Sequence, residues 1–377
     1  MKQNPLLNYK RIVIKIGSSL LIDAKSGLLR VNWLKTIISD IAKLKSDGAQ
    51  IIIVSSGAVM LGRSILSLNK KNLSLEKLQA SASVGQIALL QAWRENFSEY
   101  EVKIGQILIT PNITEERRRY LNARTTIFTL LELGVVPIIN ENDSVATAEI
   151  RYGDNDRLSA RVASMLDADC LIVLSDVNGL YSAPPNSEIK GEHIPVVKSI
   201  TPEIEAMAGE ASSHLARGGM KTKVEAAKIA TLSGTDMIIA KGTDLHPLLN
   251  LSNGAKHTLF NANQCPKAAR KRWILSTLKI DGKIYIDEGA GKALKKGKSL
   301  LSIGVIKIEG EFSRGDIISI HDEKNEEIAR GLSGMDIKDA KYAMGKKSEE
   351  IIGLFGIENR VEFVHADNLV LLNNLVT

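Results

Sequence analysis

Short apolar runs rich in β-branched residues recur through the first two thirds of the chain. They lie at residues 11–16, 51–54, 106–110, 135–140, 171–176 and 237–241. Runs that are apolar at nearly every position are typical of strands whose two faces are both buried, whereas half-buried strands alternate. The pattern therefore predicts a sheet that is covered on both sides.

The spacing of apolar residues becomes helical between these runs. Within residues 32–47 the apolar side chains form one stripe at helical spacing, and Gly48 ends it. Thr201, Pro202 and Glu203 supply a capping hydroxyl, a proline and a first-turn acid, which together indicate a helix start. Strands that alternate with helices indicate crossover connections. We therefore predict an α/β fold with an open, mostly parallel sheet sandwiched by helices.

The pattern changes after about residue 265. A basic, proline-marked joint begins there, and short alternating segments broken by glycines follow it, which is typical of a small, mostly-β module. Composition shifts of this kind mark domain boundaries. We expect a first domain over residues 1–265, a basic linker over 266–276, a mostly-β domain over 277–360 and a C-terminal tail over 361–377.

Composition narrows the class of protein. The 377 residues are 44% hydrophobic and 24% charged, as in globular proteins, and the length suggests more than one domain. The net charge of +6 permits an anionic ligand or nucleic acid without requiring either. Cys170 and Cys265 cannot build a disulfide framework or a zinc site, which fits a reducing compartment. With no signal-peptide segment and no long uncharged apolar stretch, we expect a cytoplasmic protein with no membrane span.

Residues 138–156 form a concentrated acidic stretch in this otherwise basic chain. It holds the carboxylates Glu141, Asp143, Glu149, Asp154 and Asp156, and the amides Asn140, Asn142 and Asn155, against Arg151 alone. A calcium loop would need alternating ligands and a final glutamate, which the stretch lacks. It is then either a solvated turn or a site that recognises a small, partly cationic substrate. The asparagines favour recognition, because an amide offers fixed donors and acceptors.

Glycines and small hydroxyls follow several of the predicted strands. They lie at residues 17–19, 55–59 and 175–181, and a further glycine loop, 217–223, leads into a helical pattern. Ligands bind at the carboxyl ends of parallel strands, where such loops let backbone amides approach phosphate oxygens. Lys15 and Lys223 could neutralise phosphate charge. Each loop alone is more often an ordinary turn, but together they indicate a site.

Two familiar nucleotide-binding motifs do not fit. The "GKS" at residues 297–299 lacks the earlier glycine of a P-loop, since Lys292 stands there, and no Rossmann glycine pattern follows the first strand. Any bound nucleotide must therefore be held by another architecture.

The motifs "VIKIGSS", "IVSSGAV", "PIINENDSVATAEIRYGDNDRLSARVA", "LSDVNGLY" and "GGMKTK" together resemble the amino acid kinase superfamily. They are most similar to the glutamate 5-kinases, which phosphorylate the γ-carboxylate of glutamate to begin proline synthesis. The C-terminal "RKRWI" and "GKSLLSIGVIKIEGEFSRGDIISI" resemble a PUA domain, so the resemblance covers nearly the whole chain. It implies an amino acid kinase fold followed by a PUA domain.

The resemblance also implies roles for individual residues. Lys15, Asp156 and Lys223 would be catalytic, with Asp156 holding the two lysines, and Ser56, Asp143 and Asn155 would bind L-glutamate. ATP would contact Lys15, Gly17, Ser175, Asp176, Arg217, Gly218, Gly219, Met220, Lys221, Thr222 and Lys223. Mg²⁺ would arrive bound mainly to the ATP phosphates, with no metal site built by the protein.

The expected chemistry needs no general base. The attacking carboxylate is already ionised at neutral pH, so catalysis must come from in-line positioning and charge neutralisation.

The sequence departs from the family pattern in the nucleotide loop, where Ala216 and Arg217 stand for the glycine and threonine usual in the family. We expect the activity to persist, and the nucleotide affinity could change in either direction.

Two alternatives remain at this stage. An RNA-binding or RNA-modifying role is suggested by residues 267–298, which hold ten Lys or Arg against three acids. A solvated face explains such a run more often, and few aromatics are present to stack on bases. The nearer alternative is a sibling kinase that acts on aspartate, carbamate or uridylate. The resemblance further implies a homodimer or homotetramer and a functional link to glutamyl-phosphate reductase.

Overall fold

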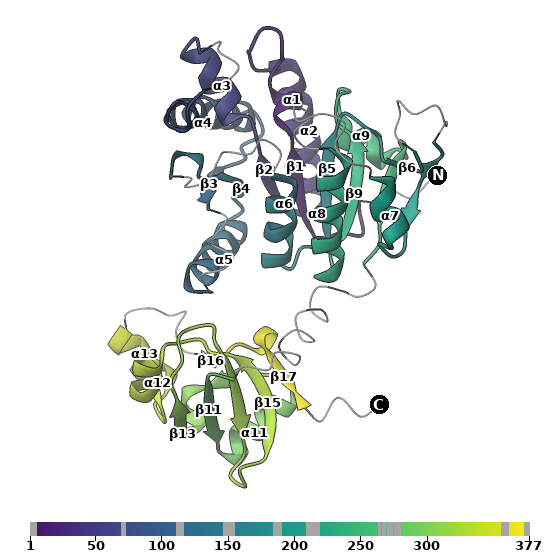
Figure 1. Cartoon of the computed structure of the whole chain (residues 1–377). Coiled ribbons are helices and arrows are strands. Elements are labelled where there is room, and N and C mark those ends of the chain that lie inside the picture. Colours follow the sequence, from purple (N-terminus) through teal and green to yellow (C-terminus); the bar gives the residue numbers. More distant parts are fainter. Residues whose placement is uncertain are drawn as a thin grey trace. The chain divides into compact units, whose positions relative to one another are not determined.

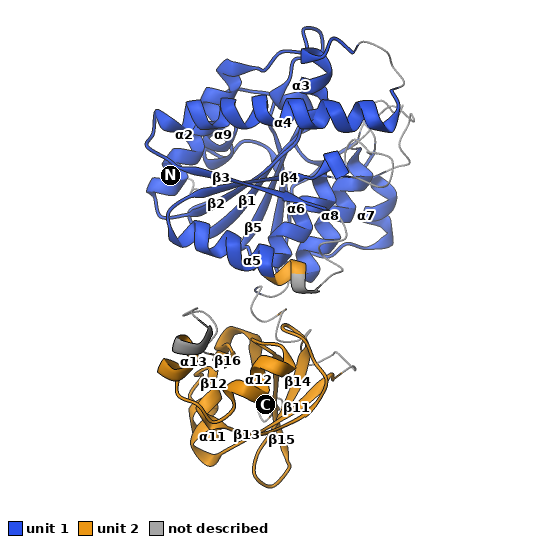
Figure 2. Ribbon diagram, turned by 90° about the vertical axis from the view of Figure 1, so that its left-hand side faces the viewer, with its two compact units in different colours: residues 1–115, 122–266 blue, residues 116–121, 267–377 orange. Residues whose placement is uncertain are grey.

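The computed structural model of the chain (Figure 1) describes most of its residues. The described ranges are 6–68, 73–110, 117–145, 155–183, 191–208, 219–262, 265, 269, 274, 280–355 and 362–372. The chain divides into two compact units, residues 1–115 with 122–266 and residues 116–121 with 267–377 (Figure 2). Each unit has its own sheet and its own hydrophobic core.

The first unit is built on an eight-stranded sheet with the strand order β3-β4-β2-β1-β5-β9-β10-β8. The strands are β1 (Arg11–Ile16), β2 (Gln50–Ser55), β3 (Ile104–Ile109), β4 (Val136–Glu141), β5 (Cys170–Ser175), β8 (Val196–Val197), β9 (Asp236–Lys241) and β10 (His257–Phe260). Neighbours pair in parallel except β9 and β10. The mostly parallel sheet predicted from the apolar runs is confirmed.

Helices cover both faces of this sheet (Figure 2). One face carries α2 (Val31–Ser46), α3 (Ala58–Ile65), α4 (Leu75–Ser98) and α9 (Pro247–Ser252), and the other carries α5 (Arg117–Glu132), α6 (Asn155–Met165) and α8 (Met220–Leu232). Short elements fill the connections: α1 (Ser18–Leu21), η2 (Asp143–Val145), the β6 (Leu180–Tyr181) and β7 (His193–Ile194) pair, and α7 (Pro202–Met207). The helices predicted at residues 32–47 and after Thr201 are α2 and α7.

The alternation along β1 explains how the two layers of helices are held. Ile12, Ile14 and Ile16 are fully buried in the core that also contains the α2 stripe and the buried side of α4. Val13 points to the other face and is equally buried. A strand buried on both sides needs apolar side chains on both faces, which is why residues 12–14 and 16 of β1 are all apolar. The exception is Lys15, whose ammonium group is paired.

Helices α3 and α4 touch through their backbones. A Cβ atom on Gly62 would lie 1.8 Å from the carbonyl oxygen of Ser81, and one on Gly85 would lie 1.9 Å from that of Ala58. Any side chain at either glycine would force the helices apart. The contact sets the register of α4 against α3, which begins just after residues 56 and 57 at the end of β2.

The second unit contains a five-stranded sheet with the order β13-β11-β14-β15-β17. Its strands are β11 (Gly282–Ile286), β13 (Val305–Gly310), β14 (Ile317–His321), β15 (Glu327–Leu332) and β17 (Leu369–Leu371), with a separate pair of β12 (Leu300–Leu301) and β16 (Glu362–Val364). Its helices are α11 (Glu288–Lys295), η3 (Ser302–Gly304), α12 (Ile337–Ala343), α13 (Ser348–Phe355) and η5 (Ala366–Asn368). The mostly-β character expected after residue 265 is confirmed.

The expected C-terminal tail needs correction. Within residues 361–377, β16 pairs with β12 and β17 pairs with β15, so both strands belong to the second unit. Phe363 and Val364 are fully buried in its core. Three-residue strands are too short to reveal a period in the sequence, which is why this part of the chain was expected to lie outside the domain.

Two further observations concern the whole described chain. None of its described helices is both long and apolar enough to cross a membrane. Cys170 and Cys265 are unpaired, the first buried in β5 and the second exposed.

Candidate active site

The candidate site lies where the parallel strands of the first unit end. β1 is followed by Gly17, β2 by Ser56, and β4 runs into the acidic stretch, while β5 ends at Ser175 beside Asp176. These strands are neighbours and run in the same direction. Their carboxyl ends therefore meet at one edge of the sheet, the usual place for a ligand in an open α/β fold.

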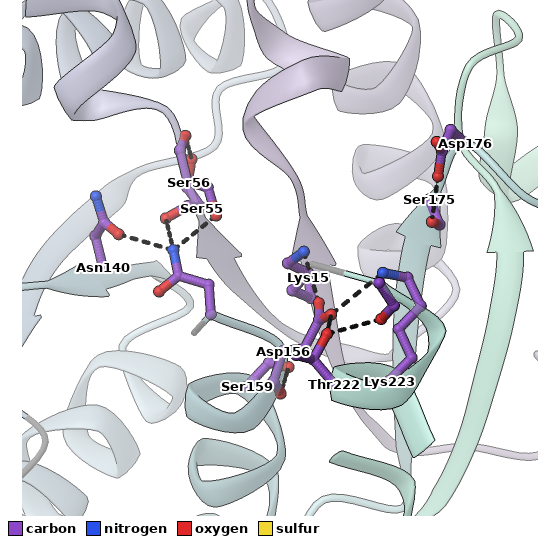
Figure 3. Close-up of polar contacts among 12 residues, drawn as sticks. Lys15, Ser55, Ser56, Asn140, Asp156, Ser159, Ser175, Asp176, Thr222 and Lys223 are labelled. Atoms are coloured by element: carbon purple, nitrogen blue, oxygen red, sulfur yellow. Dashed lines mark hydrogen bonds and ion pairs between the residues drawn. The ribbon is translucent and has the colours of Figure 1, made fainter. Parts of the chain in front are cut away.

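Asp156 is the centre of a buried ionic cluster (Figure 3). Its Oδ1 atom lies 2.6 Å from Nζ of Lys15, and its Oδ2 atom lies 3.2 Å from Nζ of Lys223. The hydroxyl of Thr222 donates to the same Oδ2 at 2.9 Å. Asp156 is fully buried, and the two lysines are only 7% and 5% exposed. One carboxylate thus fixes two ammonium groups at the edge of the sheet.

The protonation state of Asp156 follows from this environment. Burial alone would raise its pKa, but the charges of Lys15 and Lys223 and the hydrogen bonds it accepts outweigh burial and hold the pKa below the ordinary value. The carboxylate is therefore ionised at neutral pH. The three residues together carry a net positive charge in a buried place, which favours an anionic ligand.

The three charged residues of the cluster come from different elements. Lys15 lies on β1, Asp156 in the first turn of α6, and Lys223 in the first turn of α8. α6 and α8 pack against each other on one face of the sheet. α8 begins after Gly219, and its helix dipole, positive at the amino terminus, adds to the attraction for phosphate.

A group of neutral polar side chains adjoins the ionic cluster. Nδ2 of Asn155 lies 2.6 Å from Oγ of Ser56, 3.2 Å from Oδ1 of Asn140 and 3.3 Å from the carbonyl oxygen of Ser55. Ser56 and Asn140 lie side by side in Figure 3, next to the ionic cluster. Asn155 directly precedes Asp156 in α6, so the same helical turn positions both groups.

The acidic stretch borders a cavity of about 490 Å³ between α4, β3 and η2. Glu141, Asn142, Asp143 and Ser144 line it on one side, and Gln86 lines it from α4. Burial raises the pKa of Asp143 to about 6. Among the described residues that line this cavity there is none of the ionic cluster, so the cavity is separate from the catalytic candidates.

The structure places the predicted site residues in several groups. Lys15, Asp156, Thr222 and Lys223 form the ionic cluster; Ser56 and Asn155 form the neutral group; Asp143 lines the cavity; and Ser175 donates to Asp176 at the end of β5 at 2.9 Å. Gly17 lies beside the ammonium group of Lys15, Gly219 directly precedes α8, and Met220 and Lys221 are its first two residues. Arg217 and Gly218, like Ala216, lie outside the described residues.

Two polar residues of this region were not among the predicted site residues. Asn140 is 2% exposed at the end of β4, and its Nδ2 donates to Oε1 of Gln86 at 2.7 Å. Asn140 stands within the acidic stretch, so its amide could have been selected. Gln86 carries no such signal, because it is one of several glutamines along α4.

The described side chains offer little to a bare metal ion. No group of three or more His, Cys, Asp or Glu in the described part of the chain could hold one. The buried carboxylate of Asp156 is already engaged by two lysines. This donor set suits a cation that arrives on phosphate oxygens rather than one caged by protein ligands.

Comparisons with known proteins agree along the whole chain. A model of the amino acid kinase family matches residues 10–241, and a PUA domain model matches residues 282–355. A glutamate 5-kinase of Agrobacterium fabrum is 53% identical over 371 residues, which is 98% of this chain and 95% of that protein. One of Sinorhizobium fredii is 54% identical over 97% of this chain and 93% of its own. This chain belongs to the glutamate 5-kinase family.

Membership of the glutamate 5-kinase family confirms the amino acid kinase fold, the PUA domain and the assignment of the chain as a kinase. The carbamate kinase of Giardia lamblia bound to AMP-PNP covers 68% of this chain and 100% of its own, with a TM-score of 0.49 and 18% identity. That identity is too low to transfer a substrate, so the family rests on the full-length relatives.

Proposed function

We propose that this protein transfers the γ-phosphoryl group of ATP to the γ-carboxylate of L-glutamate. The products are ADP and L-glutamyl 5-phosphate, and the reaction is the first step of proline biosynthesis. The single observation that carries the proposal is the position of Asp156 between Lys15 and Lys223, directly beside the Ser56–Asn155 pair. Full-length similarity to glutamate 5-kinases supports the choice of substrate.

The ionic cluster provides what phosphoryl transfer requires. Negative charge spreads over the oxygens of the transferring group, and catalysis depends on positioning and on electrostatic stabilisation. Lys15 and Lys223 present ammonium groups from two sides, and Asp156 keeps them in place before substrate arrives. The attacking γ-carboxylate is ionised at neutral pH, so the site needs no base.

The nucleotide is assigned to the side of the site formed by β1, β5 and α8. Gly17 lies beside Lys15, where a side chain would approach the phosphate path, and Ser175 with Asp176 closes β5. The amino terminus of α8, where the helix dipole is positive, faces the phosphates in this proposal. Mg²⁺ bound to the ATP phosphates supplies the remaining charge neutralisation.

Glutamate is assigned to the neutral group and the acidic stretch. Ser56 and Asn155 adjoin the ionic cluster, so a substrate held there directs its γ-carboxylate toward the two lysines. Asp143, on η2, offers a carboxylate for the α-ammonium group. An acid for the ammonium group and amide and hydroxyl groups for the rest of the substrate form a set suited to an amino acid.

The proposal extends to the setting of the enzyme. We place it in the cytoplasm, as a homodimer or homotetramer that recognises its substrates without nucleic acid. Because an acyl phosphate hydrolyses readily, we also propose a functional link to a glutamyl-phosphate reductase. RNA binding by the second unit is at most a secondary role.

One assay tests the substrate and the reaction together. ADP release is measured with Mg²⁺–ATP and, in turn, glutamate, aspartate, carbamate and uridylate. We expect release with glutamate alone, accompanied by trapping of the acyl phosphate as a hydroxamate. ADP release with uridylate or carbamate but not with glutamate would reassign the protein to a sibling kinase.

A further inference from the structure

Two backbone groups fix which way the amides of the neutral group face. The N–H of Glu141 donates to Oδ1 of Asn140 at 2.9 Å, and a backbone N–H can only donate. The carbonyl oxygen of Ser55 lies 3.3 Å from Nδ2 of Asn155, and a carbonyl can only accept. If the amide of Asn140 were rotated by 180°, its Nδ2 would face a backbone donor. If that of Asn155 were rotated, its Oδ1 would face a backbone acceptor.

The orientation of Asn140 determines that of its neighbour on α4. Since Oδ1 of Asn140 faces Glu141 and Asn155, its Nδ2 faces Gln86, where Oε1 accepts the hydrogen bond at 2.7 Å. Asn140 is 2% exposed, so water offers no ready replacement for this acceptor. Gln86 therefore stabilises the orientation of Asn140 from the far side.

A defined pattern results at the substrate side. Nδ2 of Asn155 is occupied by Ser56, Asn140 and Ser55, so its Oδ1 is the atom left to face a ligand as an acceptor. Oγ of Ser56 accepts from Asn155 at 2.6 Å, which leaves its own hydrogen to be donated outward. An outward acceptor next to an outward donor matches an ammonium group next to a carboxylate, as in an α-amino acid.

The position of Gln86 is itself tightly constrained. It directly follows Gly85, whose missing side chain lets α4 touch the backbone of α3 at Ala58. α3 begins just beyond Ser56 at the end of β2. The contact between α3 and α4 thus fixes the position of Gln86 relative to Ser56. These two residues lie at opposite ends of the chain of hydrogen bonds that runs through Asn140 and Asn155.

We propose that Gln86 is a positioning residue for substrate recognition. Through Asn140 it holds Asn155 with its amide oxygen toward the substrate and Ser56 as an outward donor. Gln86 acts through Asn140 and need not contact glutamate. This inference rests on the proposed glutamate kinase activity, and it explains why a buried amide on β4 is paired with one on α4.

The test compares substitutions at Gln86 with a matched one on the same helix. Gln86→Leu removes the acceptor, and Gln86→Glu retains one. Gln91→Leu makes the same chemical change at an exposed residue of α4 that also borders the cavity, but whose Nε2 donates to Glu95 and not to Asn140. Gln86 is half-buried beside the cavity, so leucine can be accommodated. The Michaelis constants for glutamate and for ATP are measured, together with inhibition by glutarate, which lacks the ammonium group.

We expect Gln86→Leu to raise the Michaelis constant for glutamate roughly tenfold or more, the scale of one hydrogen bond to a charged group. The constant for ATP should stay within about twofold, and glutarate should lose less affinity than glutamate, because it makes no bond to the outward acceptor. Gln86→Glu should recover most of the loss, and Gln91→Leu should behave like the wild type.

Three outcomes would overturn the proposal. They are an unchanged Michaelis constant in Gln86→Leu, an equal loss for glutamate and glutarate, and a Gln86→Glu variant as weak as Gln86→Leu. Absence of glutamate-dependent ADP release from the wild-type enzyme would instead overturn the proposed function. The two failures are therefore distinguishable.

Discussion

The Oδ1 atom of Asp156 lies 2.6 Å from Nζ of Lys15, and this ion pair joins the first turn of α6 to the last residues of β1. Both side chains are buried. A buried ion pair is weak evidence for stability, because desolvation offsets the attraction. The role of this ion pair is to position the lysines. The same carboxylate also holds Lys223, so the two ammonium groups lie close together.

The first prediction concerns those two cations. Lys15→Ala or Lys223→Ala should lower turnover by roughly a hundredfold to a thousandfold, which is the scale of about 2.7–4 kcal/mol for removing one stabilising donor. The Michaelis constant for glutamate should change little, because the lysines act on charge that develops during transfer. Steady-state kinetics with saturating Mg²⁺–ATP measures both quantities.

Lys228→Ala provides the control for this prediction. Lys228 lies on α8 like Lys223, but it is exposed and pairs with Glu205 at the surface. It should retain wild-type turnover. Normal turnover in either cluster variant would remove that lysine from the mechanism.

The second prediction concerns stability and pH at Asp156. Asp156→Asn leaves two buried ammonium groups without their carboxylate, and loss of one partner of a buried pair costs about 3–5 kcal/mol. The pKa of Asp156 is lower in the folded protein than its ordinary value of 3.8. Its contribution to stability is therefore fully present above pH 3.8 and is lost as the pH falls through the lower, folded-state pKa.

Denaturant unfolding at a series of pH values checks this sign. The wild type should lose stability more steeply than Asp156→Asn at acid pH, so the two curves should approach each other as the pH falls. Parallel curves over the whole range would show that Asp156 is not ionised against the lysines. Turnover of the variant should also be low, because both lysines lose their anchor.

The third prediction uses the raised pKa of Asp143. Burial brings that pKa to about 6, so the carboxylate is half protonated in mildly acidic buffer. A protonated Asp143 cannot attract the ammonium group of glutamate, and the Michaelis constant for glutamate should therefore rise as the pH falls below about 6. In Asp143→Asn the constant should be high at every pH and should lack this inflection.

A pH series of the glutamate constant, run beside one of the ATP constant, measures the effect. The free γ-carboxylate of glutamate has a pKa near 4.3, roughly two pH values lower, so the substrate itself does not mask the inflection. An unaltered inflection in Asp143→Asn would assign it to another group. The ATP constant serves as the internal control, since Asp143 lines the cavity and is not part of the lysine cluster.

The strands could be predicted from sequence because one physical demand dominates them. A strand such as β5 is buried on both faces, so all its residues from Cys170 to Ser175 are buried and its sequence is nearly free of polar side chains. Loops that follow such strands must lie at one edge, which is why the neighbourhood of Ser56 and Ser175 could be anticipated. The strands of residues 362–371 could not, because they contain too few residues for any period.

The hydrogen-bonded chain of Gln86, Asn140 and Asn155 could not be predicted from the sequence, for a different reason. Gln86 and Asn140 are 54 residues apart in sequence and meet only because α4 packs against η2, which follows β4. Glutamines at positions 79, 86 and 91 of α4 are alike in local pattern. Only the close approach of α4 to α3 at Gly85 decides which of them reaches the buried amide.

The last prediction concerns the two units. Every described residue assigned to substrate or nucleotide lies in the unit that ends at residue 266, and that unit has its own sheet and core. A chain that ends near residue 275 should therefore fold and retain glutamate-dependent ADP release within a few-fold of the full-length protein. Circular dichroism and the coupled ADP assay check folding and activity on the same sample.

Conversely, residues 277–377 alone should have no kinase activity. Any affinity of this unit for RNA should be weak and fall steeply with salt, because it would rest on charge alone. A truncated chain that folds but cannot phosphorylate glutamate would show that the second unit contributes to the active site.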